Sequence, residues 1–192
     1  ILALFDELSD KYSWYPACTK NIHYYNGWRT NIAHMINRKF LLPVQTMHSW
    51  KNEIDVSRYE TVRKLNDIEK VMDYLNDGRV APYTDIDTVL WKAQHNGMTR
   101  NIESKYFMLT FYKKGTVHIT FKDAELLKKF NIFGSQKKAW LPPCYGKKHY
   151  NEMTPEEKQV IDEFEGSAVE YEKTLAEKDY YLRRAGNIIA IA

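Results

Sequence analysis

The chain has 192 residues, enough for one domain with a buried core but too few for a cofactor-binding enzyme domain together with a separate recognition domain. Hydrophobic residues make up 44% and charged residues 28%, a composition that excludes a disordered chain. A membrane-spanning helix needs about 20 apolar residues, and no apolar run approaches this length, so a membrane-spanning protein is excluded as well. The net charge is only +3, but this average hides two opposed segments, because residues 113–149 carry a net +7 and residues 150–182 a net −7.

The N-terminal part predicts one helix and a meander of short strands. An apolar stripe indicates a helix over residues 1–12. Asn26-Gly27 is typical of a two-residue hairpin turn, because a type I′ turn needs positive φ at both central positions. This turn joins predicted strands at 23–25 and 28–32, and a third strand is expected at 39–42.

Two amphipathic helices are predicted next. Ser57-Arg58-Tyr59-Glu60 has the pattern of a capping box, and apolar residues then recur at helical spacing until Asp77-Gly78 ends the helix. Thr84 and Asp87 indicate the start of a second helix, which is expected to end at Asn96-Gly97.

A β-hairpin is predicted over residues 106–121. Residues 106–112 are apolar on both faces, which is typical of a central strand. Lys113-Lys114-Gly115 forms the turn, and residues 116–121 alternate strictly, which indicates a strand with one solvated face. Asp123 is expected to cap a short helix after the hairpin.

The C-terminal part predicts a long connection and a helical tail. Residues 131–153 show no regular pattern, and connections of this length are often functional. Thr154-Pro155-Glu156-Glu157 is a strong helix start, so we expect a helical tail over 154–185. Short antiparallel strands mixed with several helices indicate a single α+β domain spanning residues 1–192.

The sequence lacks the common catalytic signatures. The eight glycines stand far apart, which excludes a Gly-x-Gly cofactor loop, a phosphate-binding loop and a Gly-x-Ser-x-Gly elbow. Cys18 and Cys144 form no Cys-x-x-Cys pair, so neither a disulfide framework nor a zinc site is indicated, and we predict no catalytic residue, no metal and no cofactor in this chain. One partial match, Asp87 with Glu103 and Lys105, is a remote indication of a metal-dependent nuclease, and the simpler interpretation is a strand edge.

Five stretches of the chain are similar to a known family. They are Asn21-Ile22-His23-Tyr24-Tyr25-Asn26-Gly27-Trp28-Arg29-Thr30-Asn31, Lys64-Leu65-Asn66-Asp67-Ile68-Glu69-Lys70-Val71, Phe111-Tyr112-Lys113-Lys114-Gly115-Thr116-Val117-His118-Ile119, Phe130-Asn131-Ile132-Phe133-Gly134-Ser135-Gln136-Lys137-Lys138, and Trp140-Leu141-Pro142-Pro143 with Tyr145-Gly146-Lys147-Lys148. Together they resemble an uncharacterised bacterial domain that follows a class I S-adenosylmethionine-dependent methyltransferase domain in phage and mobile-element proteins. The resemblance extends from about residue 5 to residue 182.

The resemblance implies that the chain is the C-terminal fragment of a DNA methyltransferase. The chain starts at Ile1 without an initiator methionine, which agrees with a fragment. The catalytic domain and its S-adenosylmethionine would then belong to the part of the polypeptide before Ile1, and the family offers no catalytic residue to carry over. A reducing cytoplasm is the expected location.

The leading functional hypothesis is therefore a non-catalytic accessory domain that binds DNA and helps to recognise the target. Lysines neutralise phosphates and aromatic rings stack on bases, and both kinds of residue alternate in the basic segment. The predicted nucleic-acid contacts are Arg29, Lys113, Lys114, Lys137, Lys138, Trp140, Tyr145, Lys147 and Lys148.

The alternative hypothesis is a structural or oligomerisation module. Adjacent segments of +7 and −7 can pair with each other, either within one chain or between two copies. The sequence does not fix the oligomeric state.

Overall fold

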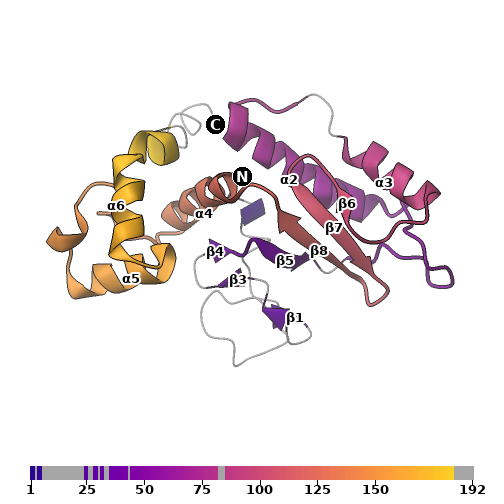
Figure 1. The fold of residues 1–192 in the computed structure, drawn as a ribbon, viewed down its shortest axis with the longest axis horizontal. Helices are drawn as coiled ribbons and strands as arrows, with labels where there is room; N and C mark the ends of the chain where they lie inside the picture. Colours follow the sequence, from indigo (N-terminus) through magenta and orange to yellow (C-terminus); the bar gives the residue numbers. More distant parts are fainter. Residues whose placement is uncertain are drawn as a thin grey trace.

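A computed structural model describes residues 1–2, 4–5, 24–25, 28–29, 31–32, 35–42, 44–81 and 85–183, with only the backbone for 24–32 and 182–183. The strands are β1 (Tyr24–Tyr25), β2 (Trp28–Arg29), β3 (Asn31–Ile32), β4 (Met35–Ile36), β5 (Lys39–Leu42), β6 (Ile102–Glu103), β7 (Phe107–Tyr112) and β8 (Thr116–Phe121). The helices are α2 (Tyr59–Asp77), α3 (Ile86–His95), α4 (Ala124–Lys137), α5 (Pro155–Glu165) and α6 (Ala168–Ala176), with short helical turns η1 (Tyr150–Glu152) and η2 (Asp179–Arg183). This α+β architecture confirms the predicted fold class (Figure 1).

The central sheet has four antiparallel strands in the order β5-β8-β7-β6. Val117, Ile119 and Phe121 of β8 are at most 1% exposed, while His118 and Thr120 lie half-buried on the other face. Gly115 turns the hairpin with a φ of +80°, a conformation that favours glycine. The predicted central hairpin with one apolar face is therefore confirmed.

The predicted N-terminal meander is correct only in part. β1 and β2 pair on either side of Asn26-Gly27, which confirms the hairpin, although these two turn residues lie outside the described residues. β3 and β4 form a second small ladder, and β5 joins β8 of the central sheet rather than a neighbouring N-terminal strand. The buried Phe40, Leu41 and Leu42 explain this pairing, because an apolar strand gains more from the central sheet than from a surface ladder. Most of the predicted helix over 1–12 lies outside the described residues.

Helix starts show where local patterns mislead. The predicted capping box at Ser57 is wrong, since α2 begins at Tyr59 without a side-chain cap, and the Ser57 hydroxyl donates to Asp55 at 2.5 Å. By contrast, Asp123 caps α4 by accepting from two backbone N–H groups, as predicted. Thr154 and Glu157 form the predicted capping box of α5.

The predicted connection over 131–153 is wrong in its first part, because α4 continues to Lys137. The Asn131 amide accepts from Ile36 N at 2.8 Å and donates to Ile36 O at 3.1 Å, which fixes α4 to β4. Gly134 allows the ring of Phe5 to approach, since a Cβ at this position would lie 2.2 Å from that ring. Tertiary contacts therefore extend the helix past residues with low helix propensity.

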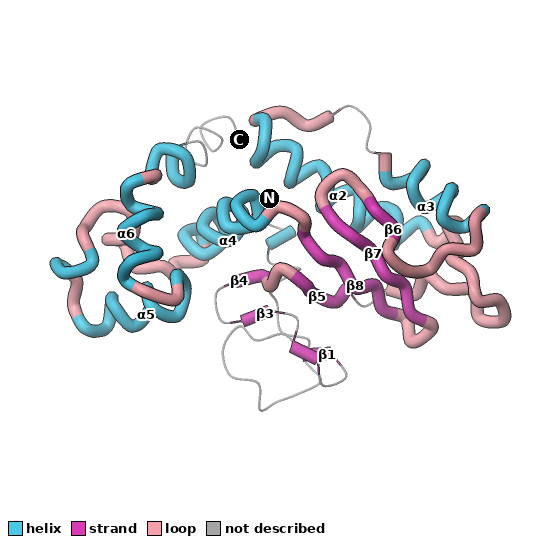
Figure 2. The backbone as a smooth tube through the Cα atoms, viewed as in Figure 1, coloured by secondary structure: helices cyan, strands magenta, loops and turns pink. Residues whose placement is uncertain are grey.

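Two hydrophobic cores share α4. The first core joins the sheet, α2, α3 and the start of α4, and it includes Leu126 and Phe130. The second core joins Ile132 near the end of α4 to α5, α6 and Tyr181. Figure 2 shows the result, an elongated molecule with the sheet at one end and α5 and α6 at the other. Among the described residues, none of the helices combines the length and the apolar character needed to cross a membrane.

Candidate nucleic-acid interface

Three lysines of the basic segment serve the fold. Lys122 Nζ lies 2.8 Å from a carboxylate oxygen of Glu103, and Lys128 Nζ lies 2.8 Å from Glu165. Lys129 is only 4% exposed, and its Nζ lies 3.4 Å from the centre of the Tyr180 ring. The charge of +7 counted in the sequence therefore overstates the charge left for a ligand, because these three lysines already contact partners in the same chain.

The other lysines of the segment are exposed in two separate places. Lys113 and Lys114 lie in the β7–β8 turn, and Lys137 ends α4. Figure 1 shows the β7–β8 turn and the C-terminal end of α4 at opposite ends of the molecule. The predicted contacts therefore do not form one continuous surface. Arg29 lies in β2, and its side chain is outside the described residues.

Residues 137–149, here called the lysine connection, form a folded backbone with exposed lysines. Trp140 N and Leu141 N donate to Ser135 O, and the N–H groups of Lys147 and Lys148 donate to Cys144 O at 2.9 and 3.2 Å. The side chain of Tyr171 bridges the second turn, because its hydroxyl accepts from Gly146 N and donates to Lys148 O. The exposed lysines that this backbone carries are Lys137, Lys138, Lys147 and Lys148.

The predicted stacking residues of the lysine connection point inward. Tyr145 is 2% exposed, and its hydroxyl donates to Glu165 at 2.5 Å. Burial, followed by the charge of Glu165, raises the pKa of Tyr145 well above its ordinary value. Trp140 is half-buried, and its ring centre lies 5.8 Å from that of Phe5. The interpretation of Tyr145 as a stacking platform is therefore corrected, because its ring belongs to the second core.

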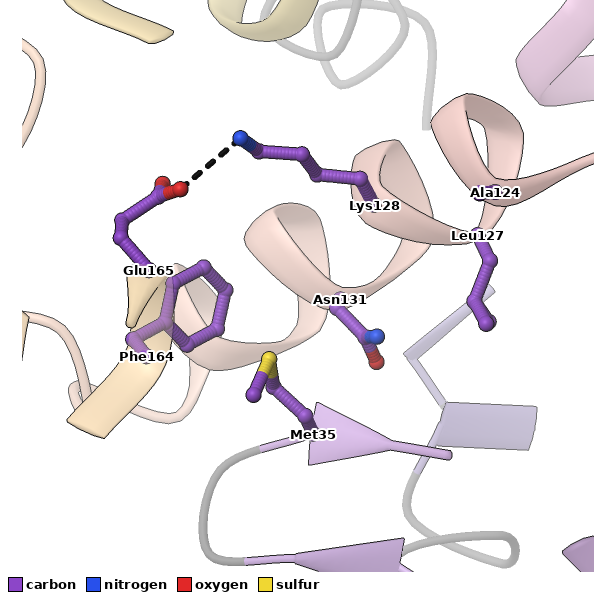
Figure 3. A pocket seen from close by; sticks show the side chains of 7 residues that line it. All are labelled: Met35, Ala124, Leu127, Lys128, Asn131, Phe164 and Glu165. Carbon is purple, nitrogen blue, oxygen red and sulfur yellow. Dashed lines mark ion pairs between the residues drawn. The ribbon is translucent and has the colours of Figure 1, made fainter. Parts of the chain in front are cut away.

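A small pocket of about 220 Å³ opens between α4, α5 and β4 (Figure 3). Its polar side chains already have partners within the chain. Lys128 pairs with Glu165 at one side, and Asn131 uses its amide on the backbone of Ile36. The remaining lining residues are apolar, namely Met35, Ala124, Leu127 and Phe164. The pocket therefore lacks convergent polar groups that would orient a substrate.

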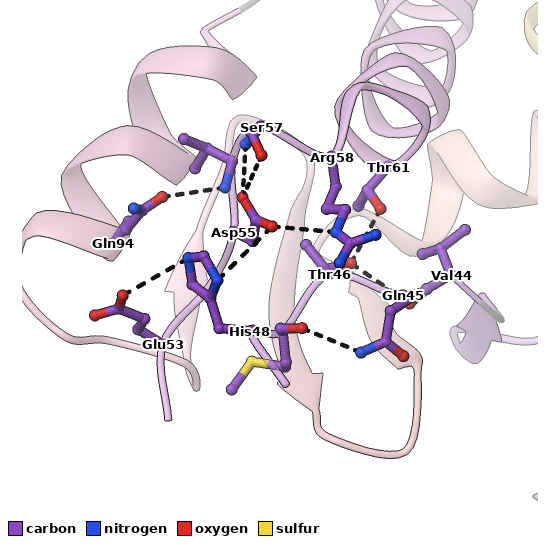
Figure 4. A network of polar contacts seen from close by, with 12 residues as sticks. Val44, Gln45, Thr46, His48, Glu53, Asp55, Ser57, Arg58, Thr61 and Gln94 are labelled. Atoms are coloured by element: carbon purple, nitrogen blue, oxygen red, sulfur yellow. Dashed lines mark hydrogen bonds and ion pairs between the residues drawn. The ribbon is translucent and has the colours of Figure 1, made fainter. Parts of the chain in front are cut away.

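Residues 44–58, here called the tryptophan loop, connect β5 to α2 at the sheet end of the molecule (Figure 4). Met47 and Ile54 pair at its base and are at most 2% exposed. Asp55 accepts from the backbone and side chain of Ser57 and from Arg58 Nε, and a hydrogen bond from the Ser57 hydroxyl is the main cause that lowers the pKa of Asp55. At the tip of this well-fixed loop, Trp50 is 96% exposed.

The C-terminal part of α3 packs beside the tryptophan loop. Gln94 accepts from Val56 N at 3.1 Å, which fixes the two elements together. Trp91 lies one turn before Gln94, is 54% exposed, and stacks on His95 with the ring centres 4.1 Å apart. Neither Trp50 nor Trp91 is among the nucleic-acid contacts predicted from the sequence. The available signal was a tryptophan between polar residues in a loop, as in Ser49-Trp50-Lys51.

The partial nuclease match is not assembled in the structure. Glu103 is engaged by Lys122, and Lys105 Nζ lies 2.5 Å from Asp73 of α2, while Asp87 is exposed on α3. Burial opposes the ionisation of Asp73, but the hydrogen bonds from Lys105 and from the Tyr106 hydroxyl outweigh it and lower its pKa. In the part of the chain that the structure describes, no three metal-ligating side chains converge.

Comparison with known proteins gives a family but no function. No curated protein and no solved structure is significantly similar to the chain. The family model named "Domain of unknown function (DUF4942)" matches residues 1–140, which include the sheet, α2, α3 and α4. The chain therefore belongs to the DUF4942 domain family.

Proposed function

We propose that this domain is a non-catalytic DNA-binding module that serves a methyltransferase domain of the same polypeptide. The observation that carries the proposal is the lysine connection, whose tightly hydrogen-bonded backbone holds four exposed lysines. Side chains presented by a fixed backbone lose less conformational freedom on binding than those of a flexible tail.

The chemistry of lysine suits a phosphate backbone. Lys137 and Lys138 extend from the last turn of α4, and Lys147 and Lys148 follow in the next turn of the chain. Each lysine that contacts a phosphate releases a counterion from DNA, so the affinity falls steeply with salt. The aromatic rings of the lysine connection are packed inward. This surface therefore suits contacts with phosphates, which hold a duplex but do not recognise its base sequence.

The methyltransferase partner is inferred from the resemblance of five stretches to domains that follow such enzymes. An enzyme that modifies a base must take it out of the helix, and the duplex must be held while this happens. S-adenosylmethionine would be bound by the methyltransferase domain, and the present domain would supply affinity for DNA.

The test is binding to a fluorescently labelled duplex at low salt, followed by anisotropy. Two double variants, Lys137→Ala with Lys138→Ala and Lys147→Ala with Lys148→Ala, are each expected to weaken binding about tenfold. The matched control removes two exposed lysines elsewhere, Lys70→Ala with Lys178→Ala, and is expected to bind within about twofold of the wild type. Absence of binding by the wild type, or equal losses in all three variants, would contradict the proposal.

A role in oligomerisation is the second candidate, and one observation favours it. Lys128 of the basic segment pairs with Glu165 of the acidic segment, so the two segments are complementary within the chain. Exposed acidic residues of α5 and α6 remain at the surface for a second copy. Light scattering separates the candidates, since a salt-sensitive dimer without affinity for DNA would support oligomerisation and contradict the first proposal.

A further inference from the structure

The tryptophan loop has the features of a second nucleic-acid contact. We propose that Trp50 stacks on an unpaired base of single-stranded DNA, with Lys113 and Lys114 neutralising the neighbouring phosphates. This inference rests on the proposed DNA-binding function and extends it to a second, distant surface and to a different form of DNA.

Trp50 lies on a loop whose backbone is fixed by hydrogen bonds. It is 96% exposed, although the loop that carries it is anchored on both sides. His48 N donates to Glu53 O at 3.1 Å, and Asp55 N donates to Thr46 O at 2.7 Å. A large apolar ring held away from the core by a fixed loop is preorganised for a flat partner.

The charges around Trp50 favour a polyanion. The acidic residues of the loop are neutralised locally, since Glu53 lies 3.4 Å from Lys51, and Asp55 is bonded to Arg58. The adjacent β7–β8 turn adds two exposed lysines, and residues 112–122 contain no acidic residue. The Gln45 side chain reaches this turn, because its Oε1 would lie 2.7 Å from a Cβ on Gly115.

A second flat surface lies on the neighbouring helix. Trp91 of α3 is stacked on His95, with the ring centres 4.1 Å apart. Residues three apart lie on the same side of a helix, so Trp91 lies on the side of α3 from which Gln94 accepts from Val56 N of the loop. Two half-exposed or fully exposed tryptophans beside lysines match the combination that binds single strands, in which bases stack on aromatic rings and cations follow the backbone.

A single strand fits this surface better than a duplex or a protein. In a duplex the faces of the bases are covered by their neighbours, so Trp50 would find no free face on which to stack. An aromatic anchor for a protein is typically surrounded by residues that exclude water. The neighbours Ser49, Lys51 and Asn52 are instead polar and exposed.

The experiment measures binding of labelled oligo(dT) of about 12 nucleotides and of a duplex of the same length, with the wild type and two variants. Trp50→Ala is expected to weaken oligo(dT) binding about tenfold, because one stacked base is lost, and to leave duplex binding within about twofold. Trp50→Phe keeps a ring and is expected to restore most of the loss. Circular dichroism of each variant controls for folding.

The outcomes separate this inference from the proposed function. Equal oligo(dT) binding by Trp50→Ala and the wild type overturns the inference. Duplex binding without any oligo(dT) binding by the wild type also overturns it, and leaves the proposed function in place with a protein as the partner for Trp50. Failure to bind either ligand overturns both.

Discussion

The tryptophan loop and the lysine connection contain the same kinds of residue, aromatic residues beside lysines, but differ in the exposure of the aromatic ring. In the lysine connection the aromatic Tyr145 is 2% exposed and the lysines point outward. In the tryptophan loop the aromatic Trp50 is 96% exposed, and the charged residues pair within the loop, Lys51 with Glu53 and Arg58 with Asp55. An aromatic residue beside a lysine in a sequence therefore does not reveal whether its ring is buried or exposed.

The largest predicted effect lies in the lysine connection. Tyr145→Ala is expected to lower the free energy of unfolding by about 4 kcal/mol, because it leaves a cavity next to Phe164 and Tyr171 in the second core. Tyr145→Phe removes only the hydrogen bond to Glu165 and should cost about 1 kcal/mol. Urea denaturation at pH 7 measures both, and a loss below about 1 kcal/mol for Tyr145→Ala would show that the ring is not a core residue.

Removing the cation that pairs with Glu165 has the next largest effect. Glu165 accepts from Tyr145 and lies 2.8 Å from Lys128 Nζ, and its side chain is 2% exposed. Lys128→Ala leaves this carboxylate without its cation, and we expect a loss of about 2 kcal/mol in the free energy of unfolding. Lys137→Ala is the matched control, since this lysine is exposed, and it should change stability by less than about 0.5 kcal/mol. Similar losses in the two variants would contradict the assignment of Lys128 to the fold.

The base of the tryptophan loop gives a pH-dependent effect. Hydrogen bonds, of which that from the Ser57 hydroxyl has the largest effect, lower the pKa of Asp55 in the folded protein. Its carboxylate therefore stabilises the fold at pH values above the unfolded pKa of about 3.8. This contribution is lost as the pH falls through the lower pKa of the folded state. Asp55→Asn should therefore cost about 1 kcal/mol at pH 7, and the difference from the wild type should shrink below about pH 4. Chemical denaturation at several pH values tests this, and a difference independent of pH would contradict it.

The smallest predicted effect is at the tip of the same loop. Trp50→Ala should change the free energy of unfolding by less than about 0.5 kcal/mol, because the side chain buries almost no surface. Thermal melting measured alongside Tyr145→Ala gives the sharpest contrast between the two aromatic residues. A loss above about 1 kcal/mol for Trp50→Ala would mean that this ring packs against the protein.

Much of the fold could be predicted from local patterns. The alternation in β8 from Val117 to Phe121, the turn at Gly115 and the caps at Asp123 and Thr154 are each specified by neighbouring residues, and the structure confirms each of them. Thr116 departs from the predicted alternation, since it is buried. The end of α4 could not be predicted, because Asn131 and Gly134 are explained by Ile36 and Phe5, which lie 95 and 129 residues away in the sequence.

The candidate site was less predictable for the same reason. Composition cannot separate Lys122, Lys128 and Lys129 from the lysines proposed to bind DNA, since their partners Glu103, Glu165 and Tyr180 are brought close only by folding. The exposure of Trp50 depends on the pairing of Met47 with Ile54, which a single sequence does not show.

The central claim is that the lysine connection binds the phosphates of DNA. The most direct test is the salt dependence of duplex binding for the wild type and for the quadruple variant Lys137→Ala, Lys138→Ala, Lys147→Ala and Lys148→Ala. Each lost phosphate contact should reduce the steepness of log Kobs against log salt by about 0.9, so the quadruple variant should show a slope shallower by about 3 to 4. A wild type and a variant with the same slope would contradict the claim.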